Sequence, residues 1–426
     1  MSVPSQAPAP ASLRTRLALQ MFLQFAALGA WSPVMGRHLA NLGFTPFQIG
    51  AVYSASALAT ILTMLLAGEI ADRWVSVEKL LSLCHLCYAV LIFLAGRVTA
   101  DDPARFPRMW GCVFGAMLFY GPTSALGNAI SFRHLHDPPR QFHQVRVFGT
   151  FGWIAAAGAV SAWMGLAGRG IGDCFALGSA FAVADAAYCL TLPRTPPLRE
   201  APRRMALSGA LGMLKDPSFA LLTVLTFVLS VFTTFAYFRA SEFYPTVGIR
   251  DRFLSVTLAA GQATEVLAMF LLPWFLTRLG TKATMALGMS AWVLRYGLLA
   301  LGNPPALMVA AQALHGFCFA LTFISAQIYV ERVCPPDVRA SAQGLHGLCT
   351  MGLGMFAGGY AGGFVLQKAA AGSALPWPRF WGTAAAACLA VLAAFLIGFR
   401  ARDRSRTPTA AVSPPPPAPL PPSPAA

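Results

Sequence analysis

The sequence is built from apolar segments that are each long enough to cross a lipid bilayer. A membrane-spanning helix needs about 20 predominantly apolar residues, and the stretches between charged residues reach this length again and again. Hydrophobic residues make up 56% of the chain and charged residues only 11%. The sequence therefore predicts an all-α polytopic membrane protein. We expect twelve transmembrane helices, at about 17–36, 47–67, 79–97, 109–131, 145–167, 171–192, 218–238, 253–276, 282–301, 304–330, 341–366 and 378–399.

The formal net charge of +15 follows from membrane topology. An even number of spans places both termini on one side of the membrane. If that side is the cytoplasm, most of the 31 lysines and arginines lie in cytoplasmic segments, as the positive-inside rule requires. Arg146 and Arg295 fall within spans, and no basic block remains for binding nucleic acid. We expect both termini in the cytoplasm and no nucleic-acid partner.

The longest break between apolar segments runs from Pro193 to Pro217 and is rich in proline and arginine. It divides the spans into six plus six. Two six-helix halves that rock around a midplane site are typical of the major facilitator superfamily. The expected units are a cytoplasmic N-terminal segment (1–16), an N-terminal six-helix bundle (17–192), a basic cytoplasmic linker (193–217), a C-terminal six-helix bundle (218–399) and a disordered, proline-rich cytoplasmic tail (400–426).

A short motif after the second span points to gating. The run from Gly68 to Arg73, Gly-Glu-Ile-Ala-Asp-Arg, resembles the G-x-x-x-D-R signature of that superfamily. Gly68 permits close approach of helices, and Asp72 could accept hydrogen bonds at a helix N-terminus or pair with an arginine of a neighbouring span when the inner gate is closed. Alternatively, Asp72 and Arg73 merely solvate a tight turn.

An acid lies deep within the apolar run 253–276. Glu265 follows Gln262 by three residues, so both side chains share one face of a helix. A charged side chain at the centre of a membrane helix costs roughly 2.5 to 3.5 kcal/mol on insertion scales. Such a residue normally faces the interior of a bundle and marks a substrate or proton path, although a structural ion pair between spans is the alternative.

Several stretches, in order along the chain, resemble the bacterial nucleoside:proton symporters of the major facilitator superfamily. They include Phe22-Leu23-Gln24-Phe25, Gly50-Ala51-Val52-Tyr53-Ser54, Trp292-Val293-Leu294-Arg295 and Arg339-Ala340-Ser341-Ala342-Gln343-Gly344. The resemblance covers the chain to about Arg400. It implies a secondary active transporter of the bacterial inner membrane that takes up nucleosides together with protons.

The resemblance also implies a binding face in span five. The arginine and threonine of the family's site match Arg146 and Thr150, and its nearby phenylalanine matches Trp153. Their spacing of four and three residues places them on one helix face, where a cation, a hydroxyl group and an aromatic ring could contact a nucleoside. Alternatively, Arg146 reaches to the cytoplasmic interface and Trp153 packs in the core.

In spans seven and eight the resemblance assigns substrate contacts and the proton. The family's glutamine and glutamate match Gln262 and Glu265, so Glu265 is expected to take up and release a proton as access to water alternates. The family's polar pair in span seven falls near Thr234 and Tyr237. All four are expected to face the substrate path.

Span ten departs from the family pattern. A second acid of the family is replaced by Ala320, whereas Phe319 keeps the family's aromatic residue. The family's tyrosine has become His315, which could bind substrate, share the proton coupling or simply pack. Asp185 in span six is either an additional proton site or a buried acid with a structural partner.

Three other functions remain as alternatives. The departures in span ten leave room for a transporter of another small solute, such as a sugar or a drug. A receptor would bind a ligand without carrying it across the membrane. An intramembrane enzyme would need a nucleophile, a metal cluster or a catalytic domain, and none is apparent. We therefore expect neither enzymatic activity nor a metal or cofactor.

Overall fold

The computed structural model describes residues 11–73, 75–196, 211–335, 338–370 and 377–401. Within these ranges every regular element is a helix. The N-terminal segment before residue 11, most of the predicted linker and the proline-rich tail beyond residue 401 lie outside the described residues, as do the side chains of 64–73. We call residues 11–196 the N-terminal part and residues 211–401 the C-terminal part.

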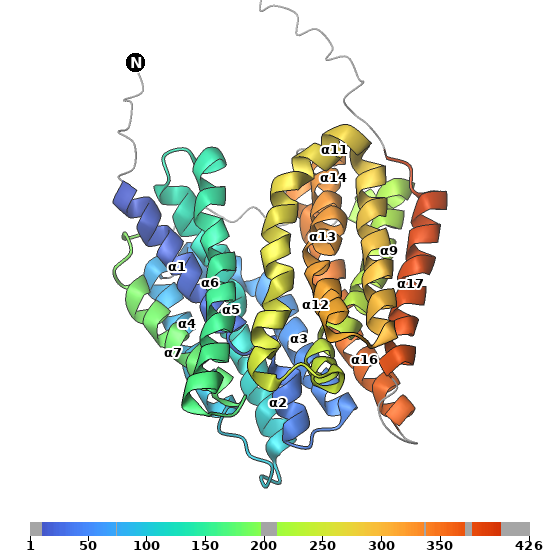
Figure 1. Cartoon of the computed structure of the whole chain (residues 1–426). Coiled ribbons are helices and arrows are strands. Elements are labelled where there is room, and N and C mark those ends of the chain that lie inside the picture. Colours follow the sequence, from blue (N-terminus) through green and yellow to red (C-terminus); the bar gives the residue numbers. More distant parts are fainter. Residues whose placement is uncertain (1–10, 74, 197–210, 336–337, 371–376, 402–426) are drawn as a thin grey trace, which may run out of the picture.

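The helices of the two parts lie on opposite sides of the molecule in Figure 1. The N-terminal part contains α1 (Ala11–Gly29), α2 (Met35–Asn41), α3 (Pro46–Arg73), α4 (Val77–Ala95), α5 (Arg105–His134), α6 (Pro138–Ala167) and α7 (Asp173–Cys189). The C-terminal part contains η1 (Met213–Lys215), α9 (Pro217–Tyr237), α10 (Ala240–Phe243), η2 (Tyr244–Val247), α11 (Asp251–Leu301), α12 (Pro305–Ala313), α13 (His315–Phe319), η3 (Ala320–Ile324), α14 (Ser325–Val333), α15 (Arg339–Gly347), η4 (Leu348–Gly354), α16 (Met355–Ala370) and α17 (Trp377–Gly398). The two parts meet where α3 packs against α16 and α6 packs against α11.

Seven helical stretches among the described residues are long and apolar enough to cross a membrane. They are Val77–Ala95, Gln141–Ala167, Pro217–Val247, Asp251–Leu301, Pro305–Val333, Ser341–Lys368 and Trp377–Gly398. This number is smaller than the twelve expected, partly because α7 has only 17 residues. The remaining difference includes a pair of predicted spans that the structure joins.

Helix α11 covers the two spans predicted at 253–276 and 282–301, and it consists of two helices that meet at a kink. Its two arms together have 51 residues, about twice the number that one crossing of the bilayer needs. Gly280 breaks its regularity, with φ +76° and ψ 171°. Only glycine adopts such a backbone conformation without steric cost, so one residue turns the chain where a loop was expected. Figure 1 shows the two arms of α11 meeting at the top of the view.

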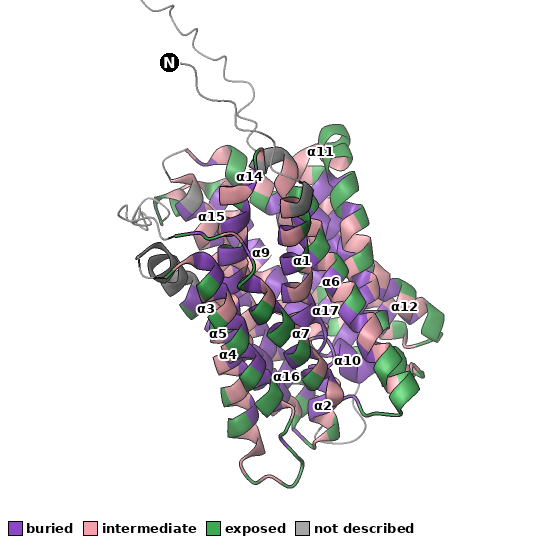
Figure 2. Ribbon diagram, turned by 90° about the vertical axis from the view of Figure 1, so that its left-hand side faces the viewer, coloured by how far each residue is buried: buried purple, intermediate pink, exposed green. Residues whose placement is uncertain are grey.

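The outer surface of the helices is apolar. Large hydrophobic side chains remain exposed there, and Leu166, Ile397 and Phe270 are 90%, 84% and 72% exposed. Figure 2 shows exposed residues along the outward faces of the helices, with buried residues between them. A water-soluble monomer rarely exposes so much contiguous apolar surface. The chain is therefore an integral membrane protein whose outer faces contact lipid.

Glycines on two faces of α16 let it pack closely between two other helices. On one face, a Cβ atom added to Gly358 would lie 2.5 Å from the carbonyl oxygen of Val231 in α9. On the other face, a Cβ added to Gly359 would lie 2.3 Å from the Oγ atom of Ser54 in α3. Ser54 Oγ also donates a hydrogen bond to the Phe356 carbonyl at 2.9 Å. Small residues at such crossings allow backbones to approach in membranes.

Replacing Gly358 by alanine should destabilise the C-terminal part, because the new methyl group would collide with the α9 backbone. Overpacking of this kind typically costs about 1 to 3 kcal/mol. The matched control is Gly158→Ala in α6, where an added Cβ meets no atom within 4 Å. Thermal unfolding of the purified variants in detergent measures the difference. Equal midpoints for the two variants would contradict the close packing of α9 and α16.

Candidate functional site

A cavity of about 190 Å³ lies among the helices of the C-terminal part. Its walls combine hydroxyl, amide and carboxyl groups with aromatic rings and methionines. The lining residues are Ser230, Thr233, Thr234, Tyr237, Phe238, Gln262, Glu265, Trp292, His315, Phe319, Phe323, Met351 and Met355. Six residues expected at the site thus share one cavity: Thr234, Tyr237, Gln262, Glu265, His315 and Phe319.

Two glycines fix the wall of the cavity that carries Glu265. A Cβ added to Gly316 of α13 would lie 2.0 Å from the backbone nitrogen of Glu265. A Cβ added to Gly261 of α11 would lie 2.9 Å from the Cβ of His315. Each helix therefore presents a glycine to the other, and their backbones come close enough to place Glu265 and His315 in the same wall.

Glu265 is half-buried in the cavity wall. It interacts electrostatically with Arg146 of α6, across the contact between α6 and α11, without a direct ion pair. The Arg146 guanidinium lies over the ring of Phe25, 4.2 Å from the ring centroid. Arg146 is thus held by a cation–π contact, and the Glu265 carboxylate is left without a direct cationic partner among the described residues.

The other residues expected in span five do not line this cavity. Trp153 packs against α1, since a Cβ added to Gly29 would lie 2.9 Å from the Cα of Trp153. Thr150 lies on the same helix, half-buried. Arg146, Thr150 and Trp153 are therefore not among the residues that line this cavity, although Arg146 interacts electrostatically with Glu265.

His315 is surrounded by aromatic rings. Its imidazole stacks on Tyr237, with centroids 5.3 Å apart, and meets the Trp292 ring edge-on at 5.4 Å. Its Nδ1 atom is buried and has no hydrogen-bond partner among the described protein groups. Ala320 is fully buried at the start of the π-helical turn η3, directly after Phe319 of the cavity wall.

Arg295, which has no partner readable from sequence, is fully buried behind the cavity. Its Nη2 atom donates to Oε1 of Gln312 at 2.6 Å, and its guanidinium lies 5.5 Å and 5.2 Å from the ring centroids of Trp292 and Tyr296. Gln312 also accepts a hydrogen bond from Tyr244 at 3.1 Å. Gln312 Nε2 donates to the Leu258 carbonyl at 3.2 Å, so the network joins both arms of α11 to α12 and η2.

Asp185 lies apart from the cavity and has a partner in α4. Its Oδ2 atom is 3.0 Å from Nε2 of His85, and both side chains are fully buried. The Cys189 thiol lies 3.6 Å from the other carboxylate oxygen. The pair connects α4 with α7, two helices that pack along each other. The structure thus supplies the neighbour of Asp185, while a role in proton transfer stays a prediction.

Several residues of the cavity wall are not among those predicted from the sequence. Ser230 and Thr233 precede Thr234 and Tyr237 by one helical turn, so helical periodicity alone would have included them. Trp292 lies in a stretch that was used only to identify the family. Met351 and Met355 follow from no pattern in the sequence, because η4 and α16 reach the cavity through tertiary packing.

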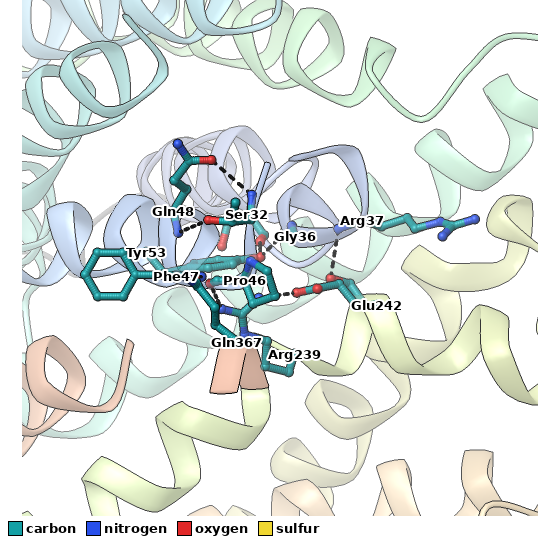
Figure 3. A network of polar contacts seen from close by, with 12 residues as sticks. Ser32, Gly36, Arg37, Pro46, Phe47, Gln48, Tyr53, Arg239, Glu242 and Gln367 are labelled. Carbon is teal, nitrogen blue, oxygen red and sulfur yellow. Dashed lines mark hydrogen bonds and ion pairs between the residues drawn. The ribbon is translucent and has the colours of Figure 1, made fainter. Parts of the chain in front are cut away.

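Contacts at the end of the molecule near α2 join its two parts. Arg239 of the C-terminal part donates to Oε1 of Glu242 at 2.7 Å and to the backbone carbonyl of Pro46, at the start of α3. Figure 3 shows Arg239 between these two partners. The Tyr53 ring of α3 stacks on Phe238 with centroids 3.9 Å apart.

Further polar links lie at the same end. The backbone N–H of Arg37 donates to Ser241 Oγ at 3.2 Å, and its side chain forms an ion pair with Asp251 at 3.1 Å. The backbone N–H of Phe47 donates to Gln367 at 3.1 Å. These hydrogen bonds and this ion pair join the two parts, as does the hydrogen bond of Ser54 in α3. We call this group of contacts the closed end.

The expected gating residues Gly68, Asp72 and Arg73 belong to the last turns of α3. Their side chains lie outside the described residues. Their role in closing the end of the molecule opposite the closed end therefore stays a prediction.

Replacing Glu242 by glutamine should destabilise the protein strongly, because Arg239 is only 1% exposed and would keep an uncompensated charge. Breaking one partner of a buried pair typically costs about 3 to 5 kcal/mol. Asp251→Asn is the matched control: the side chains of the Arg37–Asp251 pair are 30% and 31% exposed, and such pairs contribute about 0 to 1 kcal/mol. Thermal unfolding in detergent measures how far each substitution lowers the midpoint below that of the wild type. A larger decrease for Asp251→Asn than for Glu242→Gln would contradict the prediction.

Comparison with known proteins places this architecture in a family. Residues 11–404 match a family described as "Nucleoside H+ symporter". The xanthosine permease of Escherichia coli (strain K12) is 32% identical over 411 residues, which cover 91% of this chain and 96% of that protein. The nucleoside permease NupG of Escherichia coli (strain K12) is 28% identical, with coverages of 91% and 96%.

A solved structure agrees with these relatives. The crystal structure of the nucleoside transporter NupG superposes with a TM-score of 0.81 at 27% sequence identity, covering 90% of this chain and 98% of that one. The chain therefore belongs to the nucleoside H+ symporter family of the major facilitator superfamily.

Proposed function

We propose that this protein imports nucleosides together with protons across the bacterial inner membrane. The observation that carries the proposal is the cavity in which Glu265, an acid without a direct cationic partner, lies beside Gln262, Thr234 and several aromatic rings. A ribose offers hydroxyl groups to Gln262 and Thr234. A nucleobase offers a flat face that stacks on aromatic side chains, at about 1 to 3 kcal/mol per base.

The proposed mechanism is alternating access between two six-helix halves. The arms of α11 provide two of twelve spans, and the N- and C-terminal parts correspond to the predicted bundles 17–192 and 218–399. Both termini would lie in the cytoplasm, so the closed end would face the periplasm. The concentration of links between the parts at that end supports entry to the cavity from the cytoplasmic side in this conformation.

Glu265 would couple the proton to this movement. Its partner at longer range, Arg146, belongs to the other part of the chain. When the parts rock, the separation between the two groups changes, and with it the relative stability of the charged and protonated carboxyl. Protonation would thereby depend on which side of the cavity is open.

Counterflow in proteoliposomes tests the substrate. We expect labelled uridine and adenosine to exchange against unlabelled nucleoside, and an inward proton gradient to drive their accumulation. Protein that is folded by size-exclusion chromatography but exchanges neither compound would contradict nucleoside transport and favour another small solute. Exchange without gradient-driven accumulation would identify an uncoupled carrier.

Glu265→Gln should abolish gradient-driven accumulation and keep nucleoside exchange within a few fold of the wild type, because an amide retains the hydrogen bonds but cannot carry a proton. The matched control is Glu331→Gln. Glu331 pairs with Arg339 at 3.3 Å and is 52% exposed. Uptake of labelled uridine with and without the gradient separates the two activities. Undiminished accumulation in Glu265→Gln would refute the proton-carrying role.

A further inference from the structure

Phe238 lies in the wall of the cavity and also contacts the other part of the chain. It directly follows α9, which ends at Tyr237, and it is one of the residues that line the cavity. Its ring stacks on Tyr53 of α3, with the centroids 3.9 Å apart and the ring planes 7° from parallel. The residues that line the cavity belong to the C-terminal part. Tyr53 therefore lies behind this wall, at the closed end.

Each of the two stacked rings is held by its own part of the chain. Tyr53 is only 3% exposed. Its hydroxyl group accepts a hydrogen bond from the Gly36 N–H at 2.9 Å and donates one to the Ser32 carbonyl at 3.2 Å (Figure 3). Phe238 is tied to α9, because its backbone N–H donates to the Thr234 carbonyl at 3.2 Å. When the two parts move apart, each ring must follow its own part.

The backbones beside the stacked rings are also in close contact. A Cβ added to Gly36 of α2 would lie 3.0 Å from the carbonyl oxygen of Phe238. Arg239, the next residue of the chain, donates to the Pro46 carbonyl at the start of α3. A solute that leaves the cavity toward the closed end would have to separate Tyr53 from Phe238.

We propose that Tyr53 and Phe238 form the gate of the cavity at the closed end. The inference rests on the proposed transport function, since a gate controls the passage of a solute. In this conformation the stacked rings shut the cavity, and they come apart when the two parts separate at this end.

Two aromatic rings suit a contact that must break and form again in each cycle. Stacked rings exclude water over a large area. Their separation leaves no buried polar group without a partner, because the Phe238 ring has none and the Tyr53 hydroxyl keeps its hydrogen bonds within the N-terminal part. A hydrogen bond or an ion pair in the same place would lose a partner each time the gate opened.

Chemical labelling of the cavity tests the gate without any nucleoside. Met355 lines the cavity, so Met355→Cys places a thiol there as a reporter. A membrane-impermeant methanethiosulfonate reagent is added to right-side-out and to inside-out vesicles. Labelling of the parent protein is subtracted, because the chain has nine cysteines of its own. We expect fast labelling from one face of the membrane and slow labelling from the other, which we call the slow face.

Two substitutions in the reporter protein remove the stacked pair. Phe238→Leu and Tyr53→Leu should each raise labelling from the slow face by about two- to tenfold, the change in the closing equilibrium that follows from one aromatic pair. Labelling from the other face should not become faster. The double variant should open no further than Tyr53→Leu alone, because the two rings share one interaction. Tyr53→Phe keeps the ring and should raise labelling less than Tyr53→Leu.

Phe380→Leu is the matched control. The Phe380 ring stacks on Phe235 of α9, with centroids 4.3 Å apart and planes 11° from parallel. Both of these rings belong to the C-terminal part. The substitution therefore removes a similar stack without affecting the closed end, and labelling from the slow face should stay at the level of the reporter protein.

Three results would overturn the gate in proteins that are folded by size-exclusion chromatography. The first is unchanged labelling from the slow face in both Phe238→Leu and Tyr53→Leu. The second is an equal rise in Phe380→Leu or an equal rise from both faces, because either indicates a general loosening of the fold. The third is a reporter that reacts equally fast from both faces before the rings are changed. None of these results depends on nucleoside exchange, so failure of the proposed function in counterflow remains distinguishable from failure of the gate.

Discussion

The bilayer offers no water to a buried polar group, and this constraint governs where every charge of the molecule lies. Large apolar side chains face outward, and several buried charged groups have partners within the protein. Asp185 meets His85 at 3.0 Å, and Arg239 meets Glu242 at 2.7 Å. Against this background, the carboxyl group of Glu265 stands out because it lines a cavity and has no direct cationic partner among the described residues. A group that is accessible and not tied into a pair can gain and lose a proton.

The close approach of neighbouring helix backbones at glycines positions the functional groups. Gly316 lets α13 approach the Glu265 backbone, and Gly358 and Gly359 let α16 pack between α9 and α3. These contacts bring four stretches of the C-terminal part around one cavity. Besides the packing of α16 on α3, the polar and ring contacts that join the two parts of the chain are a partly exposed ion pair, single hydrogen bonds and a stacked ring pair. Because each link costs little to break, they suit an interface that must open during a transport cycle.

Hydrophobic patterning predicted the membrane class, because it is a local property of the sequence, and the resemblance to the family supplied the six residues that share the cavity. The sequence could not predict which residues of α6 line that cavity, since their position depends on how α6 packs against α1 and α11. The sequence also identified no partner for Arg295 or Asp185. Gln312 and His85 are distant in sequence, and only the packing of helices brings them near.

The sequence by itself determined that the chain is a helical membrane protein carrying an acid in the middle of span eight. The cost of placing polar backbone and charged groups in hydrocarbon leaves few other solutions for such a composition. Tertiary structure alone decided which charges are compensated and which are not. The sequence fixes where Glu265, Arg146 and Arg295 lie along the chain. Whether an opposite charge compensates each of them depends on distances between helices, because electrostatic interactions weaken with separation and strengthen as water is excluded.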